Sequence, residues 1–157
     1  MEIDAMLADH AMVSEGKLFM NGAGITDIMS TPQAPFVISV HLGVVVRVPY
    51  TATNQQHTIR VRLLDADEQP VKPFAPGQDA SAFPDLELAN QITVGRPPQL
   101  TPGDEQAVAL AFGIGNVPLE RDGSYHFSIE VDGAEATRLP FRVHRAQQPS
   151  LIQQFPV

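Results

Sequence analysis

The fold class of this chain is decided by the stretch Phe36-Val37-Ile38-Ser39-Val40-His41-Leu42-Gly43-Val44-Val45-Val46-Arg47-Val48. Every even-numbered position in it is apolar, whereas the odd-numbered positions include Ser39, His41, Gly43 and Arg47. Such alternation with a period of two is typical of a β-strand that buries one face. A stretch of this length would span about 43 Å, which is long for one strand, so we expect Gly43 to divide it by a bend or bulge.

The same alternation recurs along the chain, and turn residues separate one alternating segment from the next. The further segments are 58–63, 88–94, 108–114, 125–131 and 139–143. No window of twelve residues free of Gly and Pro shows a convincing helical period. We therefore predict an all-β protein, an antiparallel β-sandwich of about eight or nine strands with an immunoglobulin-like or C2-like architecture. The domain should span residues 1–145, followed by an extended C-terminal tail at 146–157.

The N-terminal residues predict a β-hairpin in which 3–13 and 17–28 flank the turn Ser14-Glu15-Gly16. Both faces of the first arm carry apolar residues, and such a strand is usually covered on both sides. An amphipathic helix over 3–13 is the competing interpretation.

The register of the C-terminal hairpin follows from its pattern, because the inward residues of both arms have odd numbers. Opposed residues must therefore sum to an even number, which a plain two-residue turn at Asp132-Gly133 does not give. We predict a three-residue loop, or a tight turn with one bulge. The first arrangement pairs Val131 with Glu135, Ile129 with Thr137, Phe127 with Leu139 and Tyr125 with Phe141. Pro140 has no backbone donor and should lie on an edge or at a bulge.

Composition excludes several classes of protein. The 157 residues carry a formal net charge of -8, which argues against nucleic acid or an anionic membrane as the main partner. The absence of Cys excludes disulfides, thiol catalysis and Cys-ligated zinc. The start of the chain lacks the basic region of a signal peptide, and the longest apolar run is too short to span a membrane. We therefore expect a cytoplasmic protein with no membrane span.

Residues with catalytic or metal-binding chemistry do not form a recognisable motif. The outward residues His126, Ser128 and Glu130 resemble a triad in order, but neighbours two apart on a strand stand about 6.6 Å from one another. We expect no cofactor and no enzymatic activity. The acidic segment 65–87 is the best metal candidate, because carboxylates on sandwich loops can bind calcium. Its weak candidate ligands are Asp65, Asp67, Asp79 and Asp85, and an ordinary solvated turn is the alternative.

The segment 106–115 has an unusual outward face made only of small residues. They are Ala107, Ala109, Ala111, Gly113 and Gly115. Ala and Gly are poor strand formers, so such a row suggests that something packs closely against it. Cover by another part of the same chain and contact with a second protomer are both open. The uncharged tail could supply apolar contacts through Leu151, Ile152 and Phe155.

Several turns and strands resemble a family of small uncharacterised bacterial proteins that is frequent in actinobacteria. They are Leu7-Ala8-Asp9, Val13-Ser14-Glu15-Gly16-Lys17-Leu18 with Gly22, the turn Asp122-Gly123-Ser124-Tyr125-His126-Phe127, and the strand Leu139-Pro140-Phe141-Arg142-Val143. The resemblance implies a single β-rich domain and supplies no activity or site residues.

Three functions remain open from the sequence. The first is a non-enzymatic binding or assembly module that binds a protein partner or forms a homo-oligomer through the small-residue face or a strand edge. The second is a C2-like calcium or ligand-binding domain that uses the segment 65–87. An enzyme is the least favoured, since no pocket of convergent titratable groups is evident.

Overall fold

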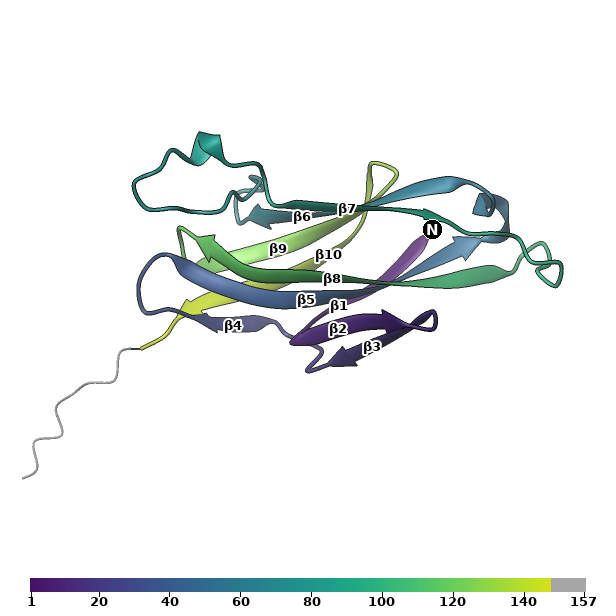
Figure 1. Ribbon diagram of the computed structural model, residues 1–157, viewed down its shortest axis with the longest axis horizontal. Helices are drawn as coiled ribbons and strands as arrows, with labels where there is room; N and C mark the ends of the chain where they lie inside the picture. The colour runs from purple at the N-terminus through teal and green to yellow at the C-terminus, as the bar shows by residue number, and fades with distance from the viewer. Residues whose placement is uncertain (148–157) are drawn as a thin grey trace, which may run out of the picture.

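A computed structural model describes residues 1–147, which form ten β-strands and two short 3-10 turns (Figure 1). The strands are β1 (Glu2–Ala8), β2 (His10–Ser14), β3 (Lys17–Asn21), β4 (Asp27–Ser30), β5 (Phe36–Pro49), β6 (Gln56–Asp65), β7 (Glu87–Thr93), β8 (Glu105–Leu119), β9 (Gly123–Val131) and β10 (Ala134–Arg145). The turns are η1 (Tyr50–Ala52) and η2 (Ala80–Ala82). The predicted all-β fold is confirmed.

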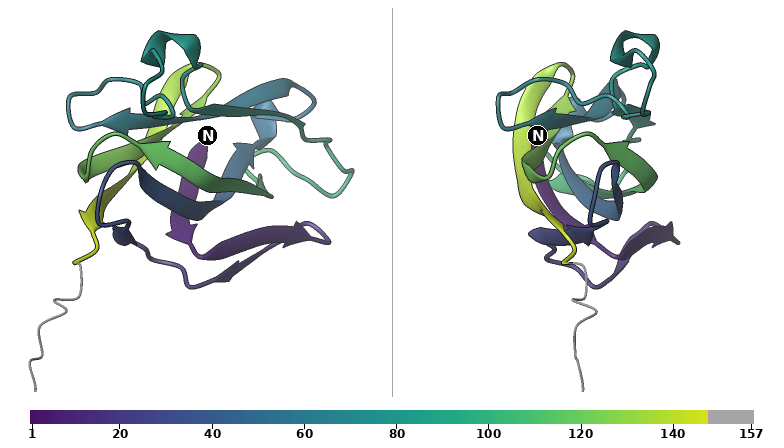
Figure 2. Two further views of the ribbon diagram at one scale, coloured as in Figure 1. Left: turned by 60° about the vertical axis from the view of Figure 1, so that its left-hand side comes forward. Right: turned by 90° about the vertical axis from the view of Figure 1, so that its left-hand side faces the viewer.

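The strands form two facing sheets and one separate hairpin. One sheet has the order β1-β5-β8 and the other β4-β10-β9-β6-β7, while β2 pairs only with β3. Figures 1 and 2 show the hairpin on the outer side of the three-stranded sheet, away from β6 and β7. Strand β4 runs parallel to β10. The sandwich is therefore not wholly antiparallel. This parallel pair was not predicted from the sequence, because the pairing of β4 with the last strand cannot be read from local patterns.

The core lies between the two sheets and is built from the alternating residues. The even-numbered side chains of β5 from Phe36 to Val48 are all buried, as are Ile59 and Leu63 of β6 and Phe127 of β9. Phe127 stacks on Phe141 of β10 with ring centroids 5.2 Å apart. One period-two pattern per strand thus predicts which side chains enter the core.

Strand β5 runs unbroken through Gly43, so the predicted division at this residue is wrong. The irregularity lies instead on the neighbouring strand, where two residues of β8 face Ser39 of β5. Asn116 takes a positive φ of 53° there and its N–H donates to the Ser39 hydroxyl. This is a β-bulge on β8, which absorbs the twist of the long pair.

Gly43 has a packing role instead. It lies beneath the β2–β3 hairpin, and a side chain at this position would overlap the end of Met20 and touch Leu18, both from β3. Ala11 of β2 is also buried. The close approach of the hairpin therefore depends on the missing Cβ at Gly43.

The N-terminal hairpin is confirmed for residues 10–21, and the helical alternative is wrong. Glu15 and Gly16 form its turn with φ values of 50° and 73°, as a type I′ turn requires. The arm before it divides at Asp9, because residues 2–8 form β1 and pair with β5 rather than with the hairpin.

The C-terminal hairpin uses the second of the two predicted arrangements, a tight turn with one bulge. Asp132 and Gly133 form the turn, and the register shifts between Glu135 and Thr137. The pairs Ile129–Thr137, Phe127–Leu139 and Tyr125–Phe141 are confirmed, whereas Val131 pairs with Ala134 instead of Glu135. Pro140 precedes Arg142, where the pairing of β10 with β4 begins.

Among residues 1–147 there is no helix long and apolar enough to cross a membrane.

Candidate functional site

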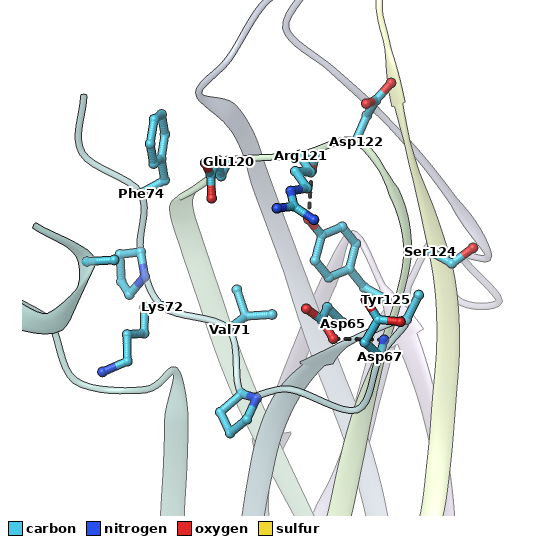
Figure 3. A pocket seen from close by; sticks show the side chains of 14 residues that line it. Asp65, Asp67, Val71, Lys72, Phe74, Glu120, Arg121, Asp122, Ser124 and Tyr125 are labelled. Atoms are coloured by element: carbon cyan, nitrogen blue, oxygen red, sulfur yellow. Dashed lines mark hydrogen bonds between the residues drawn. The ribbon is translucent and has the colours of Figure 1, made fainter. Parts of the chain in front are cut away.

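A cavity lies where the connection after β6 passes the start of β9 (Figure 3). Its volume is about 330 Å³, and its wall includes Asp65, Val71, Phe74, Arg121 and Tyr125. Figure 3 shows Tyr125 at the centre of this wall and Phe74 on the connection opposite. The size is at the lower limit of ordinary ligand pockets.

Two polar groups of this cavity wall are held by hydrogen bonds within the fold. The Tyr125 hydroxyl donates to the Arg121 carbonyl at 2.7 Å, and burial raises the pKa of this phenol. Asp122 accepts two hydrogen bonds from Arg145, and these lower the pKa of its carboxyl. Side chains that already have partners in the fold are poorly placed to activate a substrate.

The four calcium candidates hold the loop together and do not converge. Asp65 accepts backbone N–H groups of residues 67 and 69, and Asp79 accepts the N–H of Ser81. Asp85 lies 3.5 Å from the Lys72 ammonium. Asp67 lines the cavity beside Asp65. No group of three or more carboxylates or imidazoles with metal-binding geometry occurs in the described part of the chain. Calcium binding stays a prediction, which a calorimetric titration with calcium ions would check.

Two residues of the row on β9, Ser128 and Glu130, have hydrogen-bond partners on other strands. The third residue of the row is His126. Ser128 is fully buried and donates to Glu135 of β10 at 2.7 Å, not to His126. Glu130 is only 5% exposed and accepts a hydrogen bond from Arg62 of β6. Ser128 and Glu130 thus bond sideways across the sheet, whereas the buried Nε2 of His126 has no hydrogen-bond partner among the described residues and lies 3.5 Å from a Glu68 oxygen.

A second polar tie joins β6 to the turn of the C-terminal hairpin. His57 is 7% exposed, with Nδ1 2.8 Å from an Asp132 oxygen and Nε2 2.8 Å from the Ala52 carbonyl. Both acceptors are satisfied together only when the imidazole carries two protons. The hydrogen bond to Ala52 is the largest cause of a raised pKa of His57, and the hydrogen bond to Asp132 is the second largest. The hydrogen bond from His57 in turn lowers the pKa of Asp132.

This pair should make stability depend on pH. Because the pKa of His57 is raised in the fold, its contribution is complete below its ordinary value of 6.5 and is lost as pH rises through the raised value. Urea unfolding between pH 5.5 and 9 should show the difference between wild type and His57→Gln shrinking as pH rises. The control His10→Gln removes an exposed imidazole that makes no hydrogen bond to Asp132 or Ala52. A constant gap for His57→Gln would contradict the assignment.

The small-residue row on β8 is partly covered from within the chain. The hairpin packs on Gly43, which pairs with Ala111, and His41 of β5 lies against Gly113. Ala107 and Gly113 remain exposed, and Ala109 and Ala111 are half-buried. The tail candidates Leu151, Ile152 and Phe155 lie outside the residues that the structure describes. The intramolecular cover explains part of the row, and its role as an interface stays a prediction.

An apolar surface on the N-terminal strands was missed by the sequence reasoning. Within residues 1–147 the large exposed apolar side chains all fall in the first 29 positions. They are Met1, Met6, Met12, Val13, Phe19 and Met29. We name three of them the hairpin surface: Met12 and Phe19 on the hairpin, and Met6 on β1. Val13 is left out, because it shares the strand face of the buried Ala11. The signal was present in the apolar residues on both faces of 3–13, where Leu7 and Ala8 are buried and Met6 and Met12 are exposed.

The fold and these sites define a single β-sandwich domain with an apolar hairpin laid on its outer side. The chain belongs to a family of unknown function (DUF6941), whose family model matches residues 3–144. The match covers nearly the whole described domain. A comparison with curated proteins finds no match.

Proposed function

We propose that this domain is a non-enzymatic binding module whose partner is another protein, and that the hairpin surface makes the contact. One observation carries the proposal, namely that most of the large exposed apolar side chains of residues 1–147 belong to β1 and the hairpin. Patches of this kind mark interaction sites in soluble proteins, since isolated apolar residues are common but clustered ones are not.

The geometry of the hairpin supports this role. Met12 and Phe19 form a cross-strand pair on the face turned away from the sheet, because their neighbours Ala11 and Met20 face inward. They are 47% and 51% exposed. Met6 on β1 is 56% exposed and pairs with Gly43, directly beside the place where Met20 packs. Methionine is flexible and polarisable, so such a surface can adapt to a partner.

A binding role is also favoured over catalysis, because the Tyr125 hydroxyl and the Asp122 carboxylate in the cavity wall are engaged in internal hydrogen bonds. The cytoplasmic location and bacterial origin expected from the sequence remain part of the proposal, and fractionation of cells that carry a tagged chain tests the location.

The double variant Met12→Ser/Phe19→Ser should fold like the wild type and bind its partner at least about tenfold more weakly, since aromatic anchors dominate contact energies. The partner is identified by cross-linking the tagged chain in cells and is then measured against purified protein by biolayer interferometry. Met29→Ser removes an exposed apolar residue on β4 and is the matched control. Unchanged affinity in the folded double variant, or an equal loss in the control, would sink the proposal.

A further inference from the structure

The free edge of β8 is held only at its two ends. Strand β8 pairs with β5 on one side. On the other side, the Phe74 N–H donates to the Pro118 carbonyl at 2.8 Å, and the Gln106 side chain donates to the Gly95 carbonyl at 2.7 Å. Between these ties no strand of residues 1–147 pairs with residues 107–114 on that side. This stretch, which we name the open edge, presents backbone donors and acceptors to the surroundings.

The open edge lacks the usual protection against strand addition. Proteins guard edge strands with charges, proline or bulges. Residues 106–119 carry no charge, and both Pro118 and the bulge at Asn116 lie beyond the open edge. The inward side chains Leu110 and Phe112 are 9% and 8% exposed, so an added strand would also extend the core.

Charge separates β8 from the other edge strands of the two sheets. The edges β1, β4 and β7 carry Asp4, Asp27 and Glu87 respectively. Each of these carboxylates lies against a basic side chain, Arg47, His144 and Arg60 respectively. The open edge carries no charge, so two copies of it bring no like charges together. A second copy of this chain is therefore a partner that the open edge fits.

We propose that the open edge of β8 pairs with the same edge of a second copy, antiparallel and about a twofold axis. The two three-stranded sheets then join into one continuous sheet. The inward rows stay on one side only if opposed residue numbers sum to an even number. Two registers meet this condition near the middle of the open edge, centred on Leu110 and on Ala111. We take the one at Ala111, which sets Leu110 against Phe112 and Val108 against Ile114 across the contact. This contact goes beyond the proposed function, since it uses a different surface and a different partner.

Single cysteines test this geometry, because the chain has none of its own. The two copies of Ala111→Cys should lie about 5 Å apart between Cβ atoms, within reach of a disulfide. The two copies of Ala107→Cys should lie about 26 Å apart, eight strand residues from each other. Under mild oxidation Ala111→Cys should form a covalent dimer at least about tenfold faster than Ala107→Cys.

A charge placed on the open edge tests the contact without cross-linking. The wild type should show a concentration-dependent dimer by analytical ultracentrifugation, while Ala109→Lys should remain a monomer with an unchanged circular dichroism spectrum. Ala107→Lys, at a more exposed position, replaces it where Ala109→Lys does not fold. Thr93→Lys adds the same charge to the exposed edge of β7 and should leave the dimer intact.

Three results would overturn the proposal. They are a wild type that is monomeric up to millimolar concentration, equal oxidation rates for the two cysteine variants, and a dimer that survives both Ala109→Lys and Ala107→Lys. The outcome is separate from that for the hairpin surface. Loss of partner binding in Met12→Ser/Phe19→Ser leaves the dimer unchanged, and the lysine variants leave partner binding through Phe19 unchanged.

Discussion

Replacing Phe127 by alanine should lower the free energy of unfolding by about 3–5 kcal/mol. Phe127 is fully buried in β9, the middle strand of the five-stranded sheet. It pairs with Leu63 on one side and Leu139 on the other, and its ring stacks on Phe141. Truncation removes apolar burial and leaves a cavity between strands that cannot close without breaking their pairing.

Urea unfolding monitored by circular dichroism measures this loss. The control Phe19→Ala removes the same atoms from a ring that is 51% exposed and should cost less than about 1 kcal/mol. If Phe127→Ala does not fold, Phe127→Leu keeps most of the volume and should cost under about 1.5 kcal/mol. Equal losses for Phe127→Ala and Phe19→Ala would show that this ring is not at the centre of the core.

The ion pair of Arg62 and Glu130 should respond asymmetrically to substitution. Arg62→Met should lower the free energy of unfolding by about 3 kcal/mol, because it leaves the buried charge of Glu130 without its main partner. The remaining cation near Glu130 is Arg60, which lies 3.8 Å from it and also forms an ion pair with Glu87 at 3.1 Å. Glu130→Met should cost less, since the Arg62 side chain is 34% exposed and its charge can reach water.

The double variant Arg62→Met/Glu130→Met should regain most of the stability lost in Arg62→Met, because no unpaired buried charge remains. Unfolding free energies of the four proteins give the coupling directly. Equal costs for the two single variants, or additive costs in the double variant, would mean that burial of Glu130 does not govern this pair.

Local patterns predicted the parts of this fold that depend on neighbouring residues. The strand through Val40 and Val44 and the C-terminal hairpin were both readable, because alternation and turn geometry act over a few residues. Because Phe127 and Leu139 both have odd numbers and both face inward, the pattern required one extra residue in the hairpin. The structure places this residue between Glu135 and Thr137. Gly43 was misread, because its contact partner Met20 lies on a different layer.

The candidate sites were harder to predict, since they join residues distant in sequence. Arg62 bonds Glu130 across 68 positions, and His57 bonds Asp132 across 75 positions. No rule based on the spacing of residues along the sequence predicts such pairs. The apolar face of Met12 and Phe19 was visible as a pattern, but its exposure depends on where the hairpin comes to rest. The edge position of β8 likewise follows from the order of strands in the sheet.

The parallel pairing of β4 with β10 has a consequence for synthesis of the chain. Residues of β4 are translated well before their sheet partner, Arg142 to Arg145. The sheet β1-β5-β8 has all its strands by Leu119, whereas the larger sheet is incomplete until β10 emerges. The domain therefore finishes folding only after translation has passed β10, and a nascent chain halted before that point leaves apolar surface uncovered.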